Sequence, residues 1–175
     1  MMARSSVPRP GTRRGPRSAA LWLCLALPLP ALANPDGDPF IGTWSMNTAA
    51  STYAAQDMPQ SMVIVMQAAP GGIHYRSETI RRDRRVAIAE YTAGYDGHLA
   101  MVTGDAGIPA PVALKRIDRN TVEASYVRGF QKVASSRRVV SPDGDVMTVT
   151  TTSQREDGSE AVNVGVYRRL STPKD

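Results

Sequence analysis

The chain has 175 residues, a formal charge of +5 from 21 Lys and Arg against 16 Asp and Glu, and one cysteine, Cys24. Five arginines and no acidic residues lie in residues 1–33, so the rest of the chain is balanced at 16 basic and 16 acidic residues. This balance argues against a domain that binds nucleic acid through surplus positive charge. No disulfide can form after Cys24, so a single domain must fold on its core alone.

Residues 1–33 have the three-part pattern of a secretory signal peptide. Met1 to Ser18 is basic and free of acids, Ala19 to Leu29 is apolar, and Ala31-Leu32-Ala33 supplies the small residues of a cleavage site. The apolar run is shorter than the roughly 20 residues that a transmembrane helix needs. We therefore expect cleavage after Ala33, export to the periplasm or the medium, and no membrane span. Arg13-Arg14 leaves twin-arginine export open beside the general route.

A polar linker at 34–39 leads into ten β-prone runs separated by turn residues. The predicted strands are Phe40–Asn47, Ser61–Ala68, Gly72–Ile80, Arg84–Tyr95, His98–Thr103, Val112–Ile117, Thr121–Arg128, Gln131–Val140, Asp145–Gln154 and Glu160–Leu170. Their Asp-Gly and Gly-Gly turns suit tight hairpins, and no connection has room for a helical crossover between parallel strands. The sequence predicts an all-β fold: one antiparallel up-and-down barrel of about ten strands over residues 40–170, with a tail at 171–175.

Two connections carry further signals. The segment 48–60 contains a weak helical pattern, which is compatible with one or two helical turns or with an extended flap. The run Arg81-Arg82-Asp83-Arg84-Arg85 is the densest cluster of charge. It is either a solvated hairpin turn or a site that recognises an anionic headgroup.

A barrel of eight to ten strands is wide enough to hold one small ligand beside its own side chains. Flexible methionines can line such an interior or simply fill it, and tyrosines can add polar anchors. The candidates are Met62, Met66, Met101 and Met147, with Tyr126 and Tyr167 as the anchors. We expect a cavity of roughly 300 Å³ or more, the lower end for small-molecule sites.

The first and last strands carry a recognisable pair of motifs. Phe40-Ile41-Gly42-Thr43-Trp44 and Val166-Tyr167-Arg168-Arg169 resemble the two ends of a lipocalin-like or fatty-acid-binding-protein-like barrel. Segments between them, such as Tyr95-Asp96-Gly97 and Leu114-Lys115-Arg116-Ile117-Asp118, resemble small exported bacterial proteins that are described as lipocalin-like and are largely uncharacterised. The resemblance implies that Trp44 plugs the closed end of a barrel beneath Arg168 or Arg169 as a cation–π partner.

Fatty-acid-binding proteins also carry an Arg-x-Tyr pair on the last strand that clasps the ligand's carboxylate. Tyr167 matches the tyrosine of that pair, but Gly165 stands in place of the arginine and supplies no charge. The resemblance therefore implies that a neutral apolar ligand binds better than its carboxylate counterpart. Arg137, Arg138 or Arg169 could replace the missing cation, with Arg137 considered first, although burying an unpaired guanidinium is costly.

The chain contains no Gly-x-Ser-x-Gly or His-Glu-x-x-His motif. We predict no catalytic residue, metal or cofactor, and a monomer that binds a small apolar, lipid-like molecule rather than an enzyme. Three alternatives stay open. They are a filled barrel that acts through its surface at 104–111 or 81–85, a reaction chamber for an isomerase or cyclase, and a haem-binding barrel of the nitrobindin type with His74 or His98 as axial ligand.

Overall fold

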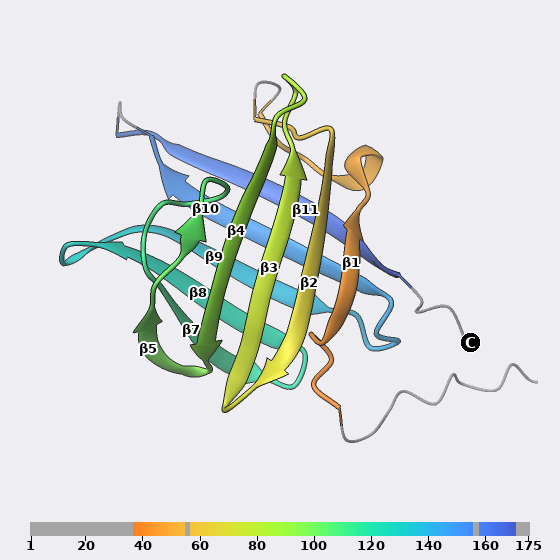
Figure 1. Ribbon diagram of the computed structural model, residues 1–175, viewed down its shortest axis with the longest axis vertical. Helices are drawn as coiled ribbons and strands as arrows, with labels where there is room; N and C mark the ends of the chain where they lie inside the picture. Colours follow the sequence, from red (N-terminus) through yellow and green to blue (C-terminus); the bar gives the residue numbers. More distant parts are fainter. Residues whose placement is uncertain (1–36, 55–56, 156–157, 171–175) are drawn as a thin grey trace, which may run out of the picture. The chain divides into compact units, whose positions relative to one another are not determined.

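A computed structural model describes residues 37–54, 57–155 and 158–170. These residues form an eleven-stranded antiparallel sheet that curls on itself, in the order β5-β7-β8-β9-β10-β11-β1-β2-β3-β4-β6 (Figure 1). The predicted all-β fold with strands paired mainly to their sequence neighbours is confirmed. The signal-peptide prediction and the tail at 171–175 lie outside the described residues. No helix in the described part of the chain is long and apolar enough to cross a membrane.

The strand bounds follow the predicted runs closely. The strands are β1 (Gly42–Met46), β2 (Ser61–Ala69), β3 (Gly72–Ile80), β4 (Val86–Gly94), β5 (Asp96–Ala100), β6 (Thr103–Gly104), β7 (Val112–Asp118), β8 (Thr121–Arg128), β9 (Gln131–Val140), β10 (Val146–Gln154) and β11 (Glu160–Leu170).

The fifth predicted run, His98–Thr103, is wrong as one strand. The chain leaves β5 after Ala100, and β6 pairs with β4 instead. Gly104 explains the change of partner: it has φ of +99°, and a Cβ there would lie 2.0 Å from the Ile88 carbonyl oxygen. Only glycine allows the backbone to approach β4 so closely.

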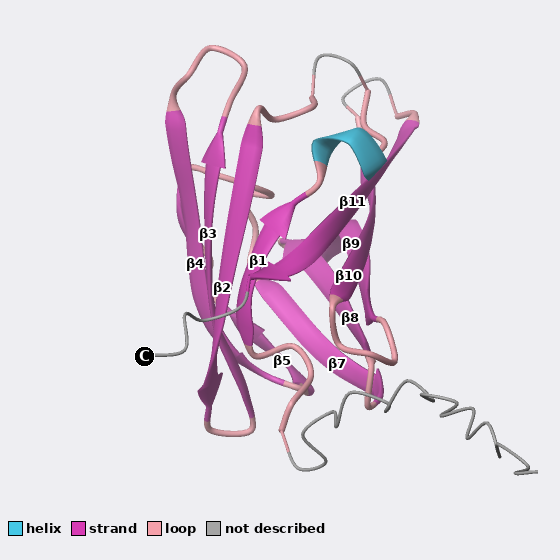
Figure 2. Cartoon of the chain, turned by 90° about the vertical axis from the view of Figure 1, so that its right-hand side faces the viewer, coloured by secondary structure: helices cyan, strands magenta, loops and turns pink. Residues whose placement is uncertain are grey.

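The hydrogen-bonded ladder does not close into a circle, because β5 and β6 are its two ends. The segment 101–111, which contains β6 and which we call the loop 101–111, links β5 to β4 and β7. The amides of Asp105 and Ala106 donate to the Ile88 carbonyl at 2.8 and 2.9 Å, and the Val127 amide donates to the Pro111 carbonyl at 3.0 Å. The curled sheet in Figure 2 is therefore closed partly by a loop rather than by strand pairing alone.

The connection between β1 and β2 contains one short 3-10 turn, η1 (Thr48–Ala50), capped by the Asn47 side chain. The chain then runs extended across β11. Thr52 and Val164 form an isolated antiparallel bridge with backbone hydrogen bonds of 2.8 and 2.7 Å. The connection is thus one helical turn followed by a strap, and residues 55–56 are outside the description.

One end of the barrel, which we call the closed end, is packed around Trp44. The indole is fully buried, and its Nε1 donates to the Phe40 carbonyl at 2.9 Å. The guanidinium of Arg169 lies 4.2 Å from the indole centroid and donates to the carbonyls of Pro39, Ile41 and Gly144 at 2.6 Å each. Arg169 is therefore the residue that covers Trp44.

Its neighbour Arg168 is exposed. Successive residues of a strand point to opposite faces, so only one of the two arginines can lie over the indole. The sequence alone left this choice open.

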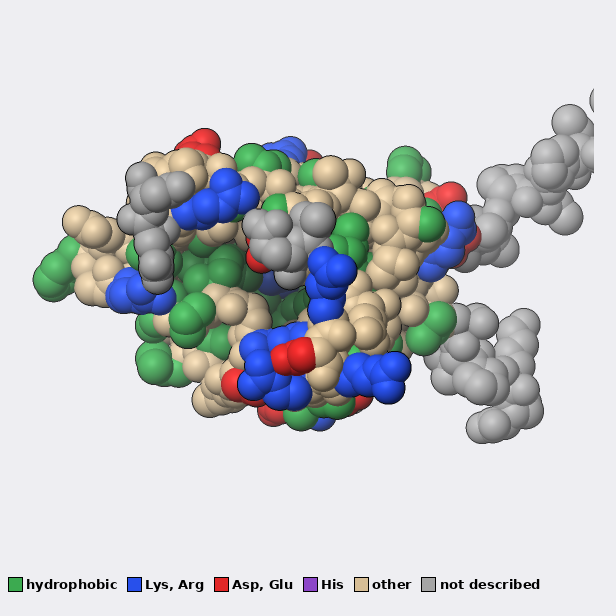
Figure 3. All heavy atoms as spheres, turned by 90° about the horizontal axis from the view of Figure 1, so that it is seen from above, with side chains coloured by type: hydrophobic (Ala, Val, Ile, Leu, Met, Phe, Trp, Pro, Cys, Tyr) green, Lys and Arg blue, Asp and Glu red, His purple; other side chains and the backbone are tan. Residues whose placement is uncertain are grey.

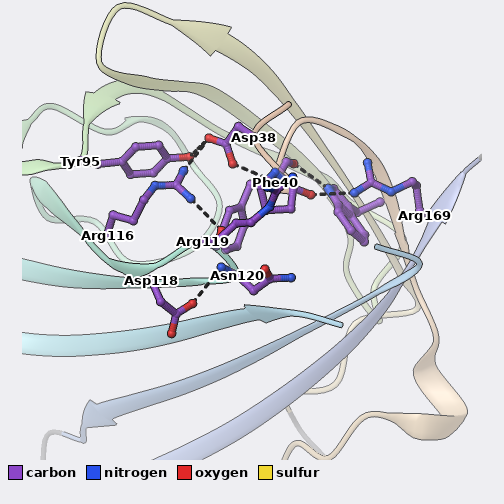
Figure 4. Close-up of polar contacts among 10 residues, drawn as sticks. Asp38, Phe40, Tyr95, Arg116, Asp118, Arg119, Asn120 and Arg169 are labelled. Atoms are coloured by element: carbon purple, nitrogen blue, oxygen red, sulfur yellow. Dashed lines mark hydrogen bonds and ion pairs between the residues drawn. The ribbon is translucent and has the colours of Figure 1, made fainter. Parts of the chain in front are cut away.

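A second arginine completes the closed end. Arg116 forms an ion pair with Asp38 at 2.6 Å and lies 4.0 Å from the ring centroid of Tyr95, whose hydroxyl donates to Asp38 at 2.7 Å (Figure 4). Burial and the Asp38 carboxylate raise the pKa of Tyr95. Residues 38–39, predicted as part of a linker, belong to the folded domain.

Candidate ligand cavity

A cavity of about 710 Å³ occupies the interior of the curled sheet. It opens at the mouth, which we define as the end bounded by the β1–β2 connection, the β3–β4 turn and the loop 101–111. Figure 3, seen from above, shows this hollow with hydrophobic side chains inside and basic side chains around it. The predicted cavity of at least 300 Å³ is confirmed, and the premise of a filled barrel is wrong.

The register of β9, β10 and β11 sets three layers of the interior. Val140, Met147 and Tyr167 lie opposite one another nearest the closed end, then Arg138, Val149 and Gly165, and then Ser136, Thr151 and Asn163 nearer the mouth. The first layer packs the core, although Tyr167 also lines the cavity, and the other two layers line the cavity except for Gly165. The opposite wall is apolar and includes Met58, Met62 and Ile64.

The central feature of the cavity is Arg138. Its side chain is only 4% exposed, and its Cζ lies 5.1 Å from the ring centroid of Tyr75 and 6.0 Å from that of Tyr91. The two tyrosine rings stack on each other at 4.6 Å. Arg138 forms no ion pair with any described carboxylate, unlike Arg116 beside Asp38. Within the described part of the chain, the guanidinium is held by aromatic faces and by no counter-ion.

Three polar atoms around this guanidinium lack a hydrogen-bond partner of good geometry. They are Nη1 of Arg138, the hydroxyl of Tyr91 and the Oγ of Ser136. Buried polar groups in native proteins are almost always paired, and each unpaired group is costly. Because Arg138 and Ser136 both line the cavity, a ligand that accepts hydrogen bonds would satisfy them.

The charge states of this cluster are fixed at neutral pH. Burial alone would lower the pKa of Arg138, but the phenol oxygens of Tyr91, Tyr126 and Tyr75 hold it above its ordinary value. Burial also raises the pKa of Tyr75, Tyr91 and Tyr167. The interior of the cavity therefore presents the Arg138 cation among neutral hydroxyls, whereas Arg81, Arg82 and Arg85 line the cavity at its mouth.

These tyrosines make alkaline stability a test of the site. An unfolded tyrosine loses its proton near pH 10, whereas the buried phenols keep theirs, so their contribution to stability is complete below pH 10 and is lost above it. We expect the free energy of unfolding to fall by about 1.4 kcal/mol per buried tyrosine for each pH unit above 10. Urea denaturation between pH 8 and 11 measures this, and Tyr91→Phe should reduce the slope. A flat profile to pH 11 would show that the phenols are not buried.

The structure brings only part of the predicted site together. Tyr126 and Tyr167 line the cavity. Met66 and Met147 are fully buried in the core and do not line it. Met101 is 71% exposed, because the chain leaves β5 just before it.

Arg137 lies on the outer face of the sheet, where it pairs with Glu123 at 2.8 Å. It does not line the cavity, so its prediction as a ligand-binding residue is wrong, because adjacent residues of β9 alternate between the two faces. The interior cation is Arg138. The expectation that neutral ligands bind better assumed an interior without a cation, and that premise is also wrong.

Gly165, which stands where the resemblance to fatty-acid-binding proteins implied an arginine, leaves room for two tyrosines. A Cβ at this position would lie 2.7 Å from the Tyr167 ring and 3.0 Å from the Tyr53 hydroxyl. The Tyr167 hydroxyl also lies 3.2 Å from the sulfur of Met62. Tyr53, on the strap, was not predicted, because nothing in the sequence places that connection over β11.

The two histidines lie away from the cavity. His74 Nδ1 is 2.9 Å from the Thr92 hydroxyl, and His98 is exposed and pairs with Asp96. Neither lines the cavity, so the interpretation of either as an axial ligand of haem is wrong. No group of three or more metal-ligating side chains occurs among the residues that the structure describes.

Comparisons with known proteins add little to this description. No family model matches the sequence, and no curated protein matches it. Among solved structures, the chain is similar to a zebrafish ileal bile acid-binding protein complexed with cholic acid. That match has a TM-score of 0.47 and 10% sequence identity, and it covers 75% of this chain and 99% of the other.

Proposed function

We propose that this protein binds one small lipid-like acid in its cavity, with the acidic group at Arg138 and the apolar body against the methionine-lined wall. The observation that carries the proposal is a buried guanidinium that lines an accessible cavity and has no partner among the described carboxylates. Burying an unpaired charge is unfavourable. A ligand anion would provide the missing partner.

The chemistry of the site favours a carboxylate or a similar oxyanion. Nη1 of Arg138 and the hydroxyl of Ser136 offer hydrogen-bond donors within the cavity, and a carboxylate oxygen accepts several. Hydrogen bonds between ions are stronger than neutral ones. Next to these donors, Thr151 and Asn163 give one wall of the cavity further polar groups, which can bind oxygens on the body of the ligand.

The same proposal includes export, a monomeric state and the absence of catalysis. Its support for export is the basic, apolar and small-residue pattern of residues 1–33. Against a reaction chamber stands the position of the two described carboxylates that line the cavity. Asp57 and Asp83 belong to the β1–β2 connection and the β3–β4 turn at the mouth, and Asp83 pairs with Arg85 at 2.6 Å.

Dodecanoate and dodecanol test the function as a matched pair, by displacement of a fluorescent apolar probe at pH 7.5. Because hydrogen bonds to charged groups contribute about 1.5–3 kcal/mol, we expect the acid to bind roughly 10–150-fold more tightly than the alcohol. Equal affinities would show that Arg138 does not contact the ligand. No displacement by either compound, or by other lipid-like acids, would refute the binding function.

A further inference from the structure

The turn between β3 and β4 places a dense cluster of cations at the mouth. Residues Arg81 to Arg85 contain four arginines and one aspartate, all exposed. We propose that this turn, the cationic rim, docks the mouth of the barrel on a membrane surface that contains anionic lipids. The inference goes beyond the proposed function, since it concerns where the protein acts and not what its cavity holds.

The backbone holds the rim in a defined shape. The Arg81 amide donates to the Arg85 carbonyl and the Arg84 amide to the Arg81 carbonyl, both at 2.9 Å. Arg84 has a positive φ of 66°, a conformation that non-glycine residues rarely adopt. The side chain of Arg81 also donates to the carbonyl of Asp105 in the loop 101–111. The four guanidinium groups are therefore presented by an ordered turn.

The rim carries more positive charge than its own aspartate can neutralise. Asp83 pairs with Arg85 at 2.6 Å, and no ion pair to another described carboxylate involves Arg84. Both Arg84 and Arg85 are exposed to solvent. The rim has four cations and one anion within five residues. Its positive charge is complementary to an anionic lipid surface, which attracts basic segments.

Apolar side chains stand beside these cations at the same opening. Met58 and Ile108, which are both partly exposed, line the cavity together with Arg81, Arg82 and Arg85. Cations next to apolar groups are typical of protein surfaces that bind at the membrane interface, where the charges contact headgroups and the apolar groups contact acyl chains. Docking in this orientation would place the cavity directly over the bilayer.

The test uses the processed protein, with its mature N-terminus verified by mass spectrometry, so that the arginines of residues 1–33 do not contribute. Co-sedimentation is measured with vesicles of phosphatidylcholine alone and with vesicles that also contain phosphatidylglycerol. We expect binding only to the anionic vesicles, and weaker binding as salt is raised. Since each cation near such a surface contributes about fivefold in affinity, Arg84→Gln with Arg85→Gln should weaken binding roughly 30-fold.

A matched control removes two exposed cations elsewhere. Lys115→Gln with Arg168→Gln changes the net charge equally but leaves the rim intact, because both residues lie on the outer face of the barrel walls. The control should retain most of the binding. An equal loss in both variants, or equal binding to both kinds of vesicle, would overturn the proposal.

Two further outcomes separate this proposal from others. In one outcome, the rim variant binds free dodecanoate more slowly than the wild type, and the wild-type protein does not bind vesicles. The rim would then attract a soluble anion, and membrane docking would be refuted. If vesicle binding is found but dodecanoate does not bind, docking stands and the proposed function fails. Circular dichroism and an unchanged denaturation midpoint show that the variants are folded.

Discussion

Replacing Arg138 with methionine is expected to stabilise the empty protein and to remove its affinity for acids. Methionine fills a similar volume without a charge, and exchanging a buried charge for an apolar side chain often stabilises a protein by about 1–4 kcal/mol. Removing one partner of a buried charge pair costs a complex about 2–5 kcal/mol. Dodecanoate affinity should therefore fall by roughly 30-fold to several thousandfold, while dodecanol affinity stays the same or rises.

The adjacent Arg137 provides the control, because it lies on the outer face and pairs with Glu123. Exposed ion pairs contribute only about 0–1 kcal/mol, so Arg137→Met should change neither stability nor ligand affinity appreciably. Urea denaturation and probe displacement measure both variants. Loss of several kcal/mol of stability in Arg138→Met would show that the arginine supports the fold and is not kept for a ligand.

Trp44→Ala is expected to reduce the free energy of unfolding by about 3–5 kcal/mol, as for other buried tryptophans. The indole is fully buried and has Arg169 over its face, so the substitution leaves a cavity and also removes the cation–π contact. Trp44→Phe keeps an aromatic ring but loses the hydrogen bond to Phe40, and it should lose markedly less stability. Urea denaturation midpoints compare the three proteins.

Arg169→Gln tests whether the two residues act together. If they do, the loss for the double variant will be smaller than the sum of the two single losses. A midpoint for Trp44→Ala within error of the wild type would contradict the position of this residue in the core.

The strands were predictable because turn residues mark nearly every hairpin. Gly71 in the β2–β3 turn and Gly144 in the β9–β10 turn each have a positive φ in the structure, as their Gly-Gly and Asp-Gly sequences indicated. Closure of the barrel was not predictable in this way. It depends on Gly104 lying against the carbonyl of Ile88, a contact between segments that no local pattern links.

The candidate site, like the fold, was only partly predictable from the sequence. Tyr167 and Tyr126 were found because one belongs to a terminal motif and the other to a strand with clear alternation. Arg138 was named only as one of three replacements for the missing cation. In the alternation of β9, however, it lies on the same face as the apolar residues Ala134 and Val140, which are buried. Applying that alternation strictly would have placed Arg138 inside and Arg137 outside.

The two ends of the described domain both leave from the closed end. Asp38 is tied to Arg116, and Leu170 pairs with Thr43 at the start of β1. A tag, a fluorophore or an attachment to a solid support at either end of the described domain would therefore leave the mouth unobstructed. This geometry makes the domain suitable as an immobilised sensor, with the cavity-lining Tyr126 or Tyr53 as positions for an environment-sensitive dye.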